Sequence, residues 1–510
     1  MFKRLILWGR GLKASYLVVL FVILAGAWRL WLMGSYYGWE ESDYGNLAMT
    51  KGVLDGGFRH FDMNHLPLYY AVSAAVMAVV GNATLASIGV SFVSGVALVG
   101  TTVLVSYRVF GVGAAWVTGL LLVLQPELAL YSASSLREPL YGLLVILALL
   151  HINERRFIVA SVLAGAAFLT RMDAFLVLAP MLLFTGGLDA RKSDRPVWLG
   201  AILCVLPMLL IVGLWSIYCH FEHGTYAFWG HSIAVNLETG GTELGGFDLI
   251  NGTSVAASLF GSVISSKFGL FVLLGWIAGI LQTQWRVHSQ QRNVAILSVL
   301  LLGFWLALGF FGQHEPGHNL YWKWLYGVAP PFILIASAGL LRFVRALPMA
   351  NLGRNSVLLI ALCPSLFSML RETDRQVKLS AEILGPQIEL ARWIEAETAD
   401  DNVMVLDNVP ERWLSRRDHS RVLYTWMDLP ICEDGTQSCQ WTPEQFAQWV
   451  EETGVEYILW YGEEWTGAPN AAPWLGDNET WMNGDVTLNP TRSARLGHVD
   501  SWVFYEVILR

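Results

Sequence analysis

Long apolar runs, separated by short polar stretches, recur along the first three quarters of the chain. A helix of about 20 predominantly apolar residues is long enough to cross the hydrocarbon core of a bilayer. The first run extends from Ser15 to Met33 behind a basic N-terminal stretch, and it is too long for the apolar part of a cleaved signal peptide. Ten further runs lie at residues 85–106, 111–131, 138–152, 157–170, 174–187, 196–217, 268–284, 293–312, 322–341 and 355–371. The pattern predicts an α-helical polytopic membrane protein with about 11 transmembrane helices.

The pattern changes after residue 371. From there to residue 510 the composition is that of a soluble domain, and helical periods alternate with strand-like runs. The stretches "SAEILGPQIELARWIEAET" and "TPEQFAQWVEETG" predict helices, whereas "DNVMVLDNV", "VEYILWY" and "HVDSWVFYEVIL" predict strands. We therefore expect a transmembrane catalytic domain over residues 1–371 and a small soluble α/β domain over residues 372–510.

The composition supports this division. Charged residues make up 15% of the chain and hydrophobic residues 54%, with a mean hydropathy of +0.46, whereas soluble domains carry about 25% charged residues. The net charge of −8 comes largely from the C-terminal part, which argues against nucleic acid as a partner. Among the five cysteines, Cys432 and Cys439 could form a disulfide if that part faces an oxidising compartment.

Residues 66–81 form one more apolar segment, which is short and contains a proline at its start. The positive-inside rule decides whether this segment crosses the membrane. If it lies on the outer surface, the inner connections carry fifteen Lys and Arg residues and the outer connections six; if it crosses, the numbers become eight and thirteen. We therefore expect a juxtamembrane helix at 66–81 in a protein of the inner (cytoplasmic) membrane. Its N-terminus would be cytoplasmic and its C-terminal domain periplasmic or extracellular.

The first outer connection in this arrangement, residues 34–84, holds three neighbouring carboxylates, Glu40, Glu41 and Asp43. Mutual repulsion in such a cluster tends to raise at least one pKa, and a carboxylate with a raised pKa can act as a general base. An acidic start to a surface helix would explain the cluster equally well. Which of the three would act as the base stays open at this point.

Cationic residues lie on the same predicted side. Arg137 adjoins Glu138, Arg171 lies in a short connection, and Lys323 precedes Tyr326 at the start of a predicted span. Arg and Lys bind phosphate groups well, so cations beside a carboxylate base predict a site that displaces a lipid-phosphate leaving group. Snorkelling of interfacial side chains is the alternative interpretation.

Two other outer segments bear on metals. The stretch "HEPGH" at residues 314–318 matches a zinc-binding pattern by letter, but its Pro-Gly centre is incompatible with the helix that the pattern needs. The large outer loop, residues 218–267, is rich in glycine and holds three scattered histidines, which are more typical of an interface than of a metal site. We expect no cofactor, while a divalent metal stays open.

Several of these stretches resemble motifs of the GT-C glycosyltransferases. "EESDY" followed by Ala48 is similar to their Asp-Glu-x-x-Tyr-x-x-x-Ala signature, and "FDMNHLPL" is similar to the Phe-Asp-x-His-Pro-Pro-Leu stretch of protein O-mannosyltransferases and their bacterial relatives. "LREPL" resembles the Leu-Asp-Pro element of lipid A aminoarabinose transferases, and "TRMDAFLVLAP" and "LYGVAPPFILIASAGL" resemble further elements of the superfamily. The resemblance covers roughly residues 1–345.

The resemblance implies a function and its residues. It places Glu40 at the catalytic Asp of the signature, Glu41 at the following Glu, His65 on the His-Pro-Pro element and Glu138 on the Asp of Leu-Asp-Pro. Glu replaces Asp at positions 40 and 138, so Glu40, Glu41 and Asp43 all remain candidate bases. Members of the superfamily use a polyprenyl-phosphate sugar and invert the anomeric centre. The O-mannosyltransferase and aminoarabinose branches are thought not to need a metal, whereas the oligosaccharyltransferase branch does.

The sequence thus predicts an inverting glycosyltransferase acting on the outer face of the membrane. The expected partners are a polyprenyl-phosphate sugar donor, membrane lipids and an acceptor protein, lipid or glycan. The predicted substrate- and phosphate-binding residues are His65, Arg137, Glu138, Arg171, Lys323 and Tyr326. A transporter or flippase for lipid-linked sugars is the alternative, although the chain lacks the internal repeat typical of one. A scaffold that binds lipid headgroups is a further alternative.

Overall fold

The chain divides into two compact units, described separately below. The first consists of Met1–Tyr36, Phe61–Val72 and Ile88–Val377, and the second of Tyr37–His60, Ser73–Ser87 and Lys378–Arg510. The computed structural model describes residues 14–36, 46–47, 49–50, 52–54, 66–192, 196–223, 226, 249–263, 267–283, 289–312, 319–398, 403–406, 422–424, 442–461, 480–496 and 500–509.

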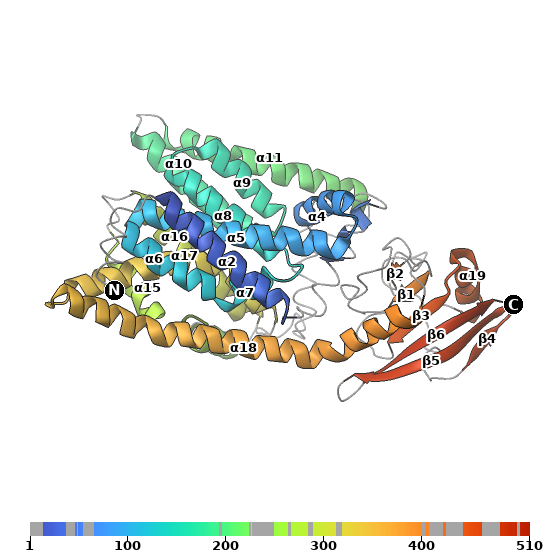
Figure 1. Ribbon diagram of the computed structural model, residues 1–510. Helices are drawn as coiled ribbons and strands as arrows, with labels where there is room; N and C mark the ends of the chain where they lie inside the picture. The colour runs from blue at the N-terminus through green and yellow to red at the C-terminus, as the bar shows by residue number, and fades with distance from the viewer. Residues whose placement is uncertain are drawn as a thin grey trace. The chain divides into compact units, whose positions relative to one another are not determined.

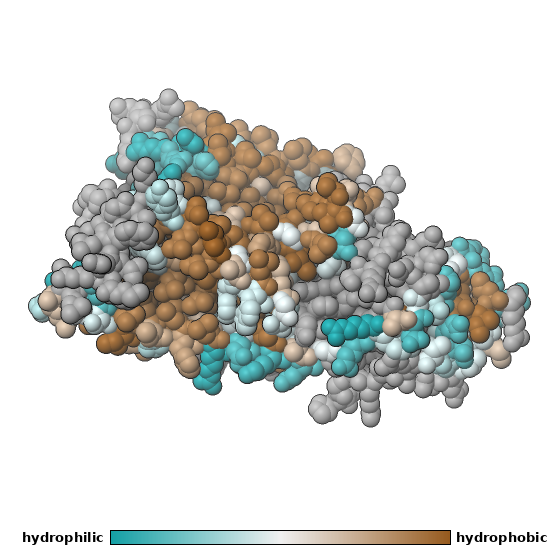
Figure 2. All heavy atoms as spheres, in the orientation of Figure 1, coloured by the Kyte–Doolittle hydropathy of each residue, from teal (hydrophilic) through white to brown (hydrophobic). Residues whose placement is uncertain are grey.

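The first unit is built from helices (Figure 1). Seven helices of the described chain are long and apolar enough to cross a membrane by length and composition. They are α2 (Ala14–Met33), α5 (Ala83–Phe110), α10 (Asp173–Lys192), α11 (Val197–His223), α16 (Ser289–Gly312), α17 (Asn319–Ala346) and α18 (Asn351–Glu397). Figure 2 shows a broad hydrophobic surface over this unit. On α11, the large apolar side chains of Trp198, Leu210 and Phe221 are exposed. Such a surface suits contact with lipid chains rather than water.

Shorter apolar helices complete the bundle. They are α4 (Leu68–Val80), α6 (Val112–Leu124), α8 (Glu138–Asn153), α9 (Phe157–Phe168) and α15 (Leu270–Leu281), with α13 (Leu249–Ser258) and the π-helix η2 (Leu259–Val263) beside them. All eleven apolar runs form helices, but α6, α8, α9 and α15 are only 12 to 16 residues long. At about 1.5 Å per residue they are shorter than the roughly 30 Å hydrocarbon core. The run at 111–131 is shorter as a helix because Pro126 begins a separate helix, α7 (Pro126–Tyr131).

Charged side chains pair at opposite ends of this bundle. At one, the Arg108 end, Arg108 pairs with Glu154 of the α8–α9 turn, and Arg155 Nε lies 3.4 Å from Asp189 Oδ1. At the other, the Glu138 end, Glu138 pairs with Arg171. The grouping matches the two sets of connections predicted to face opposite sides of the membrane.

The short helix α4 begins at the Glu138 end. The Leu68 amide donates to the Leu169 carbonyl over 3.0 Å, two residues before Arg171. Helix α5 follows after a short connection, and there Ser91 Oγ donates to the Leu136 carbonyl over 2.6 Å. Because α5 then runs to Arg108 at the opposite end, α4 cannot itself cross the bundle. This agrees with the prediction of a juxtamembrane helix at 66–81.

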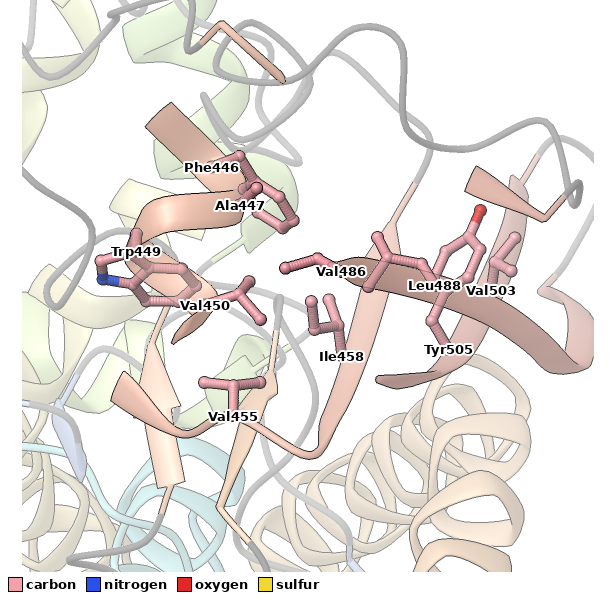
Figure 3. Packing of buried hydrophobic residues seen from close by; sticks show 10 residues of the cluster. All are labelled: Phe446, Ala447, Trp449, Val450, Val455, Ile458, Val486, Leu488, Val503 and Tyr505. Atoms are coloured by element: carbon pink, nitrogen blue, oxygen red, sulfur yellow. The ribbon is translucent and has the colours of Figure 1, made fainter. Parts of the chain in front are cut away.

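The second unit contains a six-stranded sheet of order β2-β1-β3-β6-β5-β4. Its strands are β1 (Met404–Leu406), β2 (Val422–Tyr424), β3 (Tyr457–Tyr461), β4 (Trp481–Asn483), β5 (Val486–Leu496) and β6 (Asp500–Leu509). Strands β2 and β3 flank β1 in parallel, while the pairs from β3 to β4 are antiparallel. Helix α19 (Pro443–Thr453) packs its apolar face, including Phe446 and Val450, against Ile458 and Val486 (Figure 3).

Helix α18 continues without a break from Asn351 to Glu397, through the predicted domain boundary at 371/372. Along the chain the first unit instead ends at Val377. The second unit also includes Tyr37–His60 and Ser73–Ser87, where Thr50 Oγ1 and Ser87 Oγ lie 3.2 Å apart. The change to soluble composition at 372 therefore occurs inside an element, because a helix can continue while its apolar face gives way to polar residues.

Candidate functional site

Four of the sequence-predicted binding residues are described in the first unit with their side chains: Arg137, Glu138, Arg171 and Tyr326. For Lys323 the structure gives only its place in the first turns of α17. The remaining predicted residues lie outside the described part of the chain; they are Glu40, Glu41, Asp43, His65, Cys432 and Cys439.

Arg171 lies between two carboxylates. Its Nη1 donates to Glu138 Oε1 over 2.6 Å, and its Nε donates to Asp173 Oδ1 over 3.1 Å. The three side chains are only 6%, 2% and 4% exposed, respectively, so this is a buried charged cluster. The guanidinium carbon also lies 5.8 Å from the ring centroid of Tyr141.

Local structure explains why these groups meet. Glu138 is the first residue of α8 and Asp173 the first of α10, where the orphan amides of a helix N-terminus favour a negative charge. Arg171 lies in the tight turn between α9 and α10, and its amide donates to the Ala167 carbonyl over 2.9 Å. Because α8, α9 and α10 pack against one another, the turn brings the guanidinium between the two helix starts.

Arg171 keeps its positive charge. Burial lowers the pKa of the Arg171 guanidinium, but Asp173 and Glu138 raise it by more, so the pKa lies above its usual range. Arg171 therefore stays positive and holds both carboxylates in place. One oxygen, Glu138 Oε2, is buried and accepts no hydrogen bond from any residue that the structure describes. Arg137 is the N-cap residue of α8 and is partly exposed.

Tyr326 of α17 lies next to the same helix, α8. Its hydroxyl is 3.2 Å from Ser132 Oγ, and its ring stacks on Tyr131 with centroids 6.0 Å apart and planes 4° apart. A Cβ added to Gly142 of α8 would come 3.0 Å from Tyr326 Cε1. Since Gly142 lies one turn after Glu138, the structure brings the predicted residues Tyr326, Glu138 and Arg171 to one end of the bundle.

Comparison with solved structures identifies the fold. ArnT from Cupriavidus metallidurans, solved bound to undecaprenyl phosphate, matches with a TM-score of 0.59 at 14% identity, over 97% of this chain and 98% of that one. The chain has the GT-C fold. The apo state of the same ArnT matches with a TM-score of 0.58 at 13% identity, over 96% of this chain and 98% of that one. The predicted fold class is therefore confirmed.

A more distant match is the archaeal oligosaccharyltransferase AglB from Archaeoglobus fulgidus, with a TM-score of 0.49 at 11% identity, over 89% of this chain and 70% of that one. No protein-family model matches the sequence, and no curated protein matches it either.

Sequence reasoning missed several buried ionisable residues of the first unit. Arg29 lies in α2 with no exposed surface, and Glu127 of α7 pairs with Lys267, which also pairs with Glu372 of α18. A signal was present for Arg29 and Glu127, because both interrupt apolar runs and ionisable residues in such runs are functional candidates. Lys267 and Glu372 border such runs and carry no signal of their own.

No group of three or more His, Cys, Asp and Glu side chains that could hold a metal occurs among the described residues. Asp173 and Glu138 both pair with Arg171 instead. The acidic cluster at 40–43 lies outside that part of the chain.

Proposed function

We propose that this protein is an inverting glycosyltransferase that moves a sugar from a polyprenyl-phosphate donor to an acceptor on the outer face of the membrane. The observation that carries the proposal is the buried Glu138–Arg171–Asp173 cluster at one end of a GT-C bundle. Buried ionic groups near the hydrocarbon region cost free energy, so those that a protein retains are functional candidates. The solved ArnT structure holds undecaprenyl phosphate, which supports a lipid phosphate as the donor's leaving group.

The first outer loop would supply the base. Helix α2 ends at Met33, and its Arg29 Nη2 donates to the Leu128 carbonyl at the Glu138 end of the bundle. Helix α2 thus ends at the Glu138 end, and Glu40, Glu41 and Asp43 follow it in the sequence. One of these carboxylates takes the proton of an acceptor hydroxyl or amine, whose oxygen or nitrogen attacks the anomeric carbon. The bond to the phosphate oxygen breaks, and the lipid phosphate leaves with the electron pair.

Cationic groups would stabilise the departing phosphate. Arg137 and Lys323 begin helices at this end, and we assign them to that role. Arg171 is engaged by two carboxylates, so it would act mainly by orienting Glu138. Glu138 Oε2, which has no hydrogen-bond partner among the described residues, would then accept a hydrogen bond from a hydroxyl group of the substrate.

Orientation follows from charge. The predicted inner connections carry fifteen Lys and Arg residues against six outside, which supports a cytoplasmic N-terminus and an outward-facing site in the inner membrane. Acceptor protein, lipid or glycan would then approach from the periplasmic or extracellular side, where the second unit lies in this topology.

The proposal can be tested with purified protein in nanodiscs. Radiolabelled sugars on undecaprenyl phosphate are supplied with protein, lipid and glycan fractions, and transfer of label is counted for wild type and for Glu40→Gln, Glu41→Gln and Asp43→Asn. We expect one variant to lose at least about a hundredfold in turnover, as general-base removal does. Glu154→Gln, at the Arg108 end, is the control. Full activity in all three acidic variants contradicts the assignment of the base; undecaprenyl phosphate binding without transfer favours a scaffold.

A further inference from the structure

A second buried charged cluster lies outside the site described above. Lys267 Nζ is 2.7 Å from Glu127 Oε1 and 2.6 Å from Glu372 Oε1, with the Lys267 side chain 1% exposed. Each carboxylate has further support within the first unit. Gln125 Nε2 donates to Glu127 Oε2, and Gln376 Nε2 donates to Glu372 Oε1 over 2.9 Å. We call Glu127, Lys267 and Glu372 the buried triad.

The triad joins segments that are far apart in sequence. Lys267 precedes Gly269, whose φ of +80° lies in the left-handed region that favours glycine. A Cβ at Gly269 would come 2.5 Å from Ser365 Oγ of α18, so only glycine lets this turn approach α18 so closely. The turn thus places the Lys267 ammonium between α7 and α18.

Helix α7 connects the triad to the candidate site. All six of its residues, Pro126 to Tyr131, are buried. Glu127 lies in its first turn, and Tyr131 at its end stacks on Tyr326. The next residue, Ser132, has its hydroxyl 3.2 Å from that of Tyr326, and the chain then turns directly into Glu138. A shift of α7 would therefore move both Tyr326 contacts and the start of α8.

Arg29 of α2 also holds α7. Its Nη1 donates to the Ala25 carbonyl within α2 over 3.2 Å, and its Nη2 donates to the Leu128 carbonyl over 3.0 Å. The same Leu128 carbonyl accepts a hydrogen bond from Ser132 Oγ. Arg29 of α2 and Ser132, whose hydroxyl contacts that of Tyr326, thus donate to the same carbonyl. The acidic loop follows α2 in the sequence.

We propose that α7 is a positioning element of the transferase site, held by Lys267 through Glu127 and by Arg29 through the Leu128 carbonyl. This inference rests on the proposed function. Lys267 and Glu127 act as positioning residues: they do not touch the reacting atoms, but they set where Glu138, Tyr326 and the end of α2 stand relative to one another. Displacements of about 1 Å can cost two orders of magnitude in rate, so even a small shift of α7 is expected to be measurable.

The two glutamates of the triad provide a matched pair for the test. Glu127→Gln and Glu372→Gln each remove one carboxylate from the same ammonium and conserve side-chain size, but only Glu127 lies on α7. Both variants should lower the thermal unfolding midpoint. Only Glu127→Gln should lower kcat, by about tenfold, per folded molecule, while the affinity for undecaprenyl phosphate changes less than about twofold. The pair is also assayed in isolated membranes, so that instability in detergent does not hide the result.

Hydrogen–deuterium exchange gives a readout that does not depend on activity. We expect Glu127→Gln, but not Glu372→Gln, to speed exchange in peptides covering residues 126–138. Equal kcat values for the two variants, or unchanged exchange over 126–138 in Glu127→Gln, would overturn the inference. If wild type transfers no sugar from any donor, the proposed function fails, and the exchange comparison still decides whether the triad positions α7.

Discussion

Gly327 of α17 lies directly against the ring of Tyr141 in α8: a Cβ at this glycine would come 2.6 Å from Tyr141 Cε1. The relationship is reciprocal, since Gly142 of α8 faces the ring of Tyr326 of α17. Each helix thus supplies a tyrosine and a glycine that accommodates the partner's ring. The close approach sets the distance between Tyr326 and the Arg171 cluster, because Tyr141 lies beneath the Arg171 guanidinium.

Gly327→Ala is therefore expected to destabilise the protein by about 1–3 kcal/mol, the usual cost of overpacking a well-packed core. Transfer activity should fall as well, because Tyr141 must move away from Arg171. The control is Gly303→Ala in α16, where an added Cβ meets nothing within 4 Å. Thermal unfolding in detergent and transfer activity are measured for both variants. Equal unfolding midpoints for the two alanine variants would contradict the packing argument.

Arg171→Lys should abolish transfer even though it keeps the charge. A single ammonium cannot reproduce the fork that contacts Glu138 and Asp173 through different nitrogens. Arg171→Met should cost more, about 3–5 kcal/mol, because it leaves two buried carboxylates without a cation. The yield of monodisperse protein and its transfer rate are measured. The control is Arg108→Lys at the opposite end. The Arg108 side chain is 47% exposed, so the loss of stability should stay below about 1 kcal/mol.

A double-mutant cycle between Gly95 of α5 and Ser132 tests the contacts of Tyr326. A Cβ at Gly95 would lie 1.9 Å from Ser132 Oγ, so Gly95→Ala must displace Ser132 and with it the hydrogen bond to Tyr326. We expect Gly95→Ala to lower the unfolding midpoint strongly. The double variant Gly95→Ala/Ser132→Gly should recover much of the loss, because the methyl group then fills the space that the serine side chain leaves. A coupling energy near zero in this double-mutant cycle argues against direct contact.

Arg29→Met should separate stability from activity. Arg29 is fully buried, and no carboxylate among the described residues lies within ion-pair distance of it. Removing a buried charge of this kind is often neutral or stabilising. We therefore expect an unfolding midpoint no lower than that of wild type, together with reduced turnover because the link from α2 to the Leu128 carbonyl is lost. A variant with unchanged turnover shows that this link is dispensable.

The second unit carries a testable pH dependence at the start of α19. A backbone hydrogen bond, with support from Thr442, lowers the pKa of Glu444 below its usual range. The folded pKa is thus below the unfolded one, so the stabilisation is present above the unfolded pKa and is lost as the pH falls through the folded pKa. Thr442→Ala should cost about 1 kcal/mol and weaken this dependence, because Thr442 also caps α19. The test compares the unfolding of wild type and variant between neutral pH and a pH of about 3.

Much of the fold was determined by the sequence itself. Each of the eleven apolar runs marked a helix of the first unit, because spanning a bilayer requires a long uninterrupted apolar surface, and the placement of Lys and Arg predicted that α4 does not span. The cap at Thr442 and the glycine at 454 marked α19 in the same local way. These features depend on residues close together in the sequence, so they can be predicted from the sequence alone.

Only the tertiary structure decided which charges meet. Arg171 pairs with Glu138, which begins a different helix. Lys267 pairs with Glu127 and Glu372, which lie far from it in the sequence. Neither partnership has a sequence spacing that predicts it, because each depends on how separate helices pack. Each of these two buried cations finds its counter-charges where the fold places them. Arg171, which the sequence suggested as a phosphate-binding cation, is therefore found holding two carboxylates.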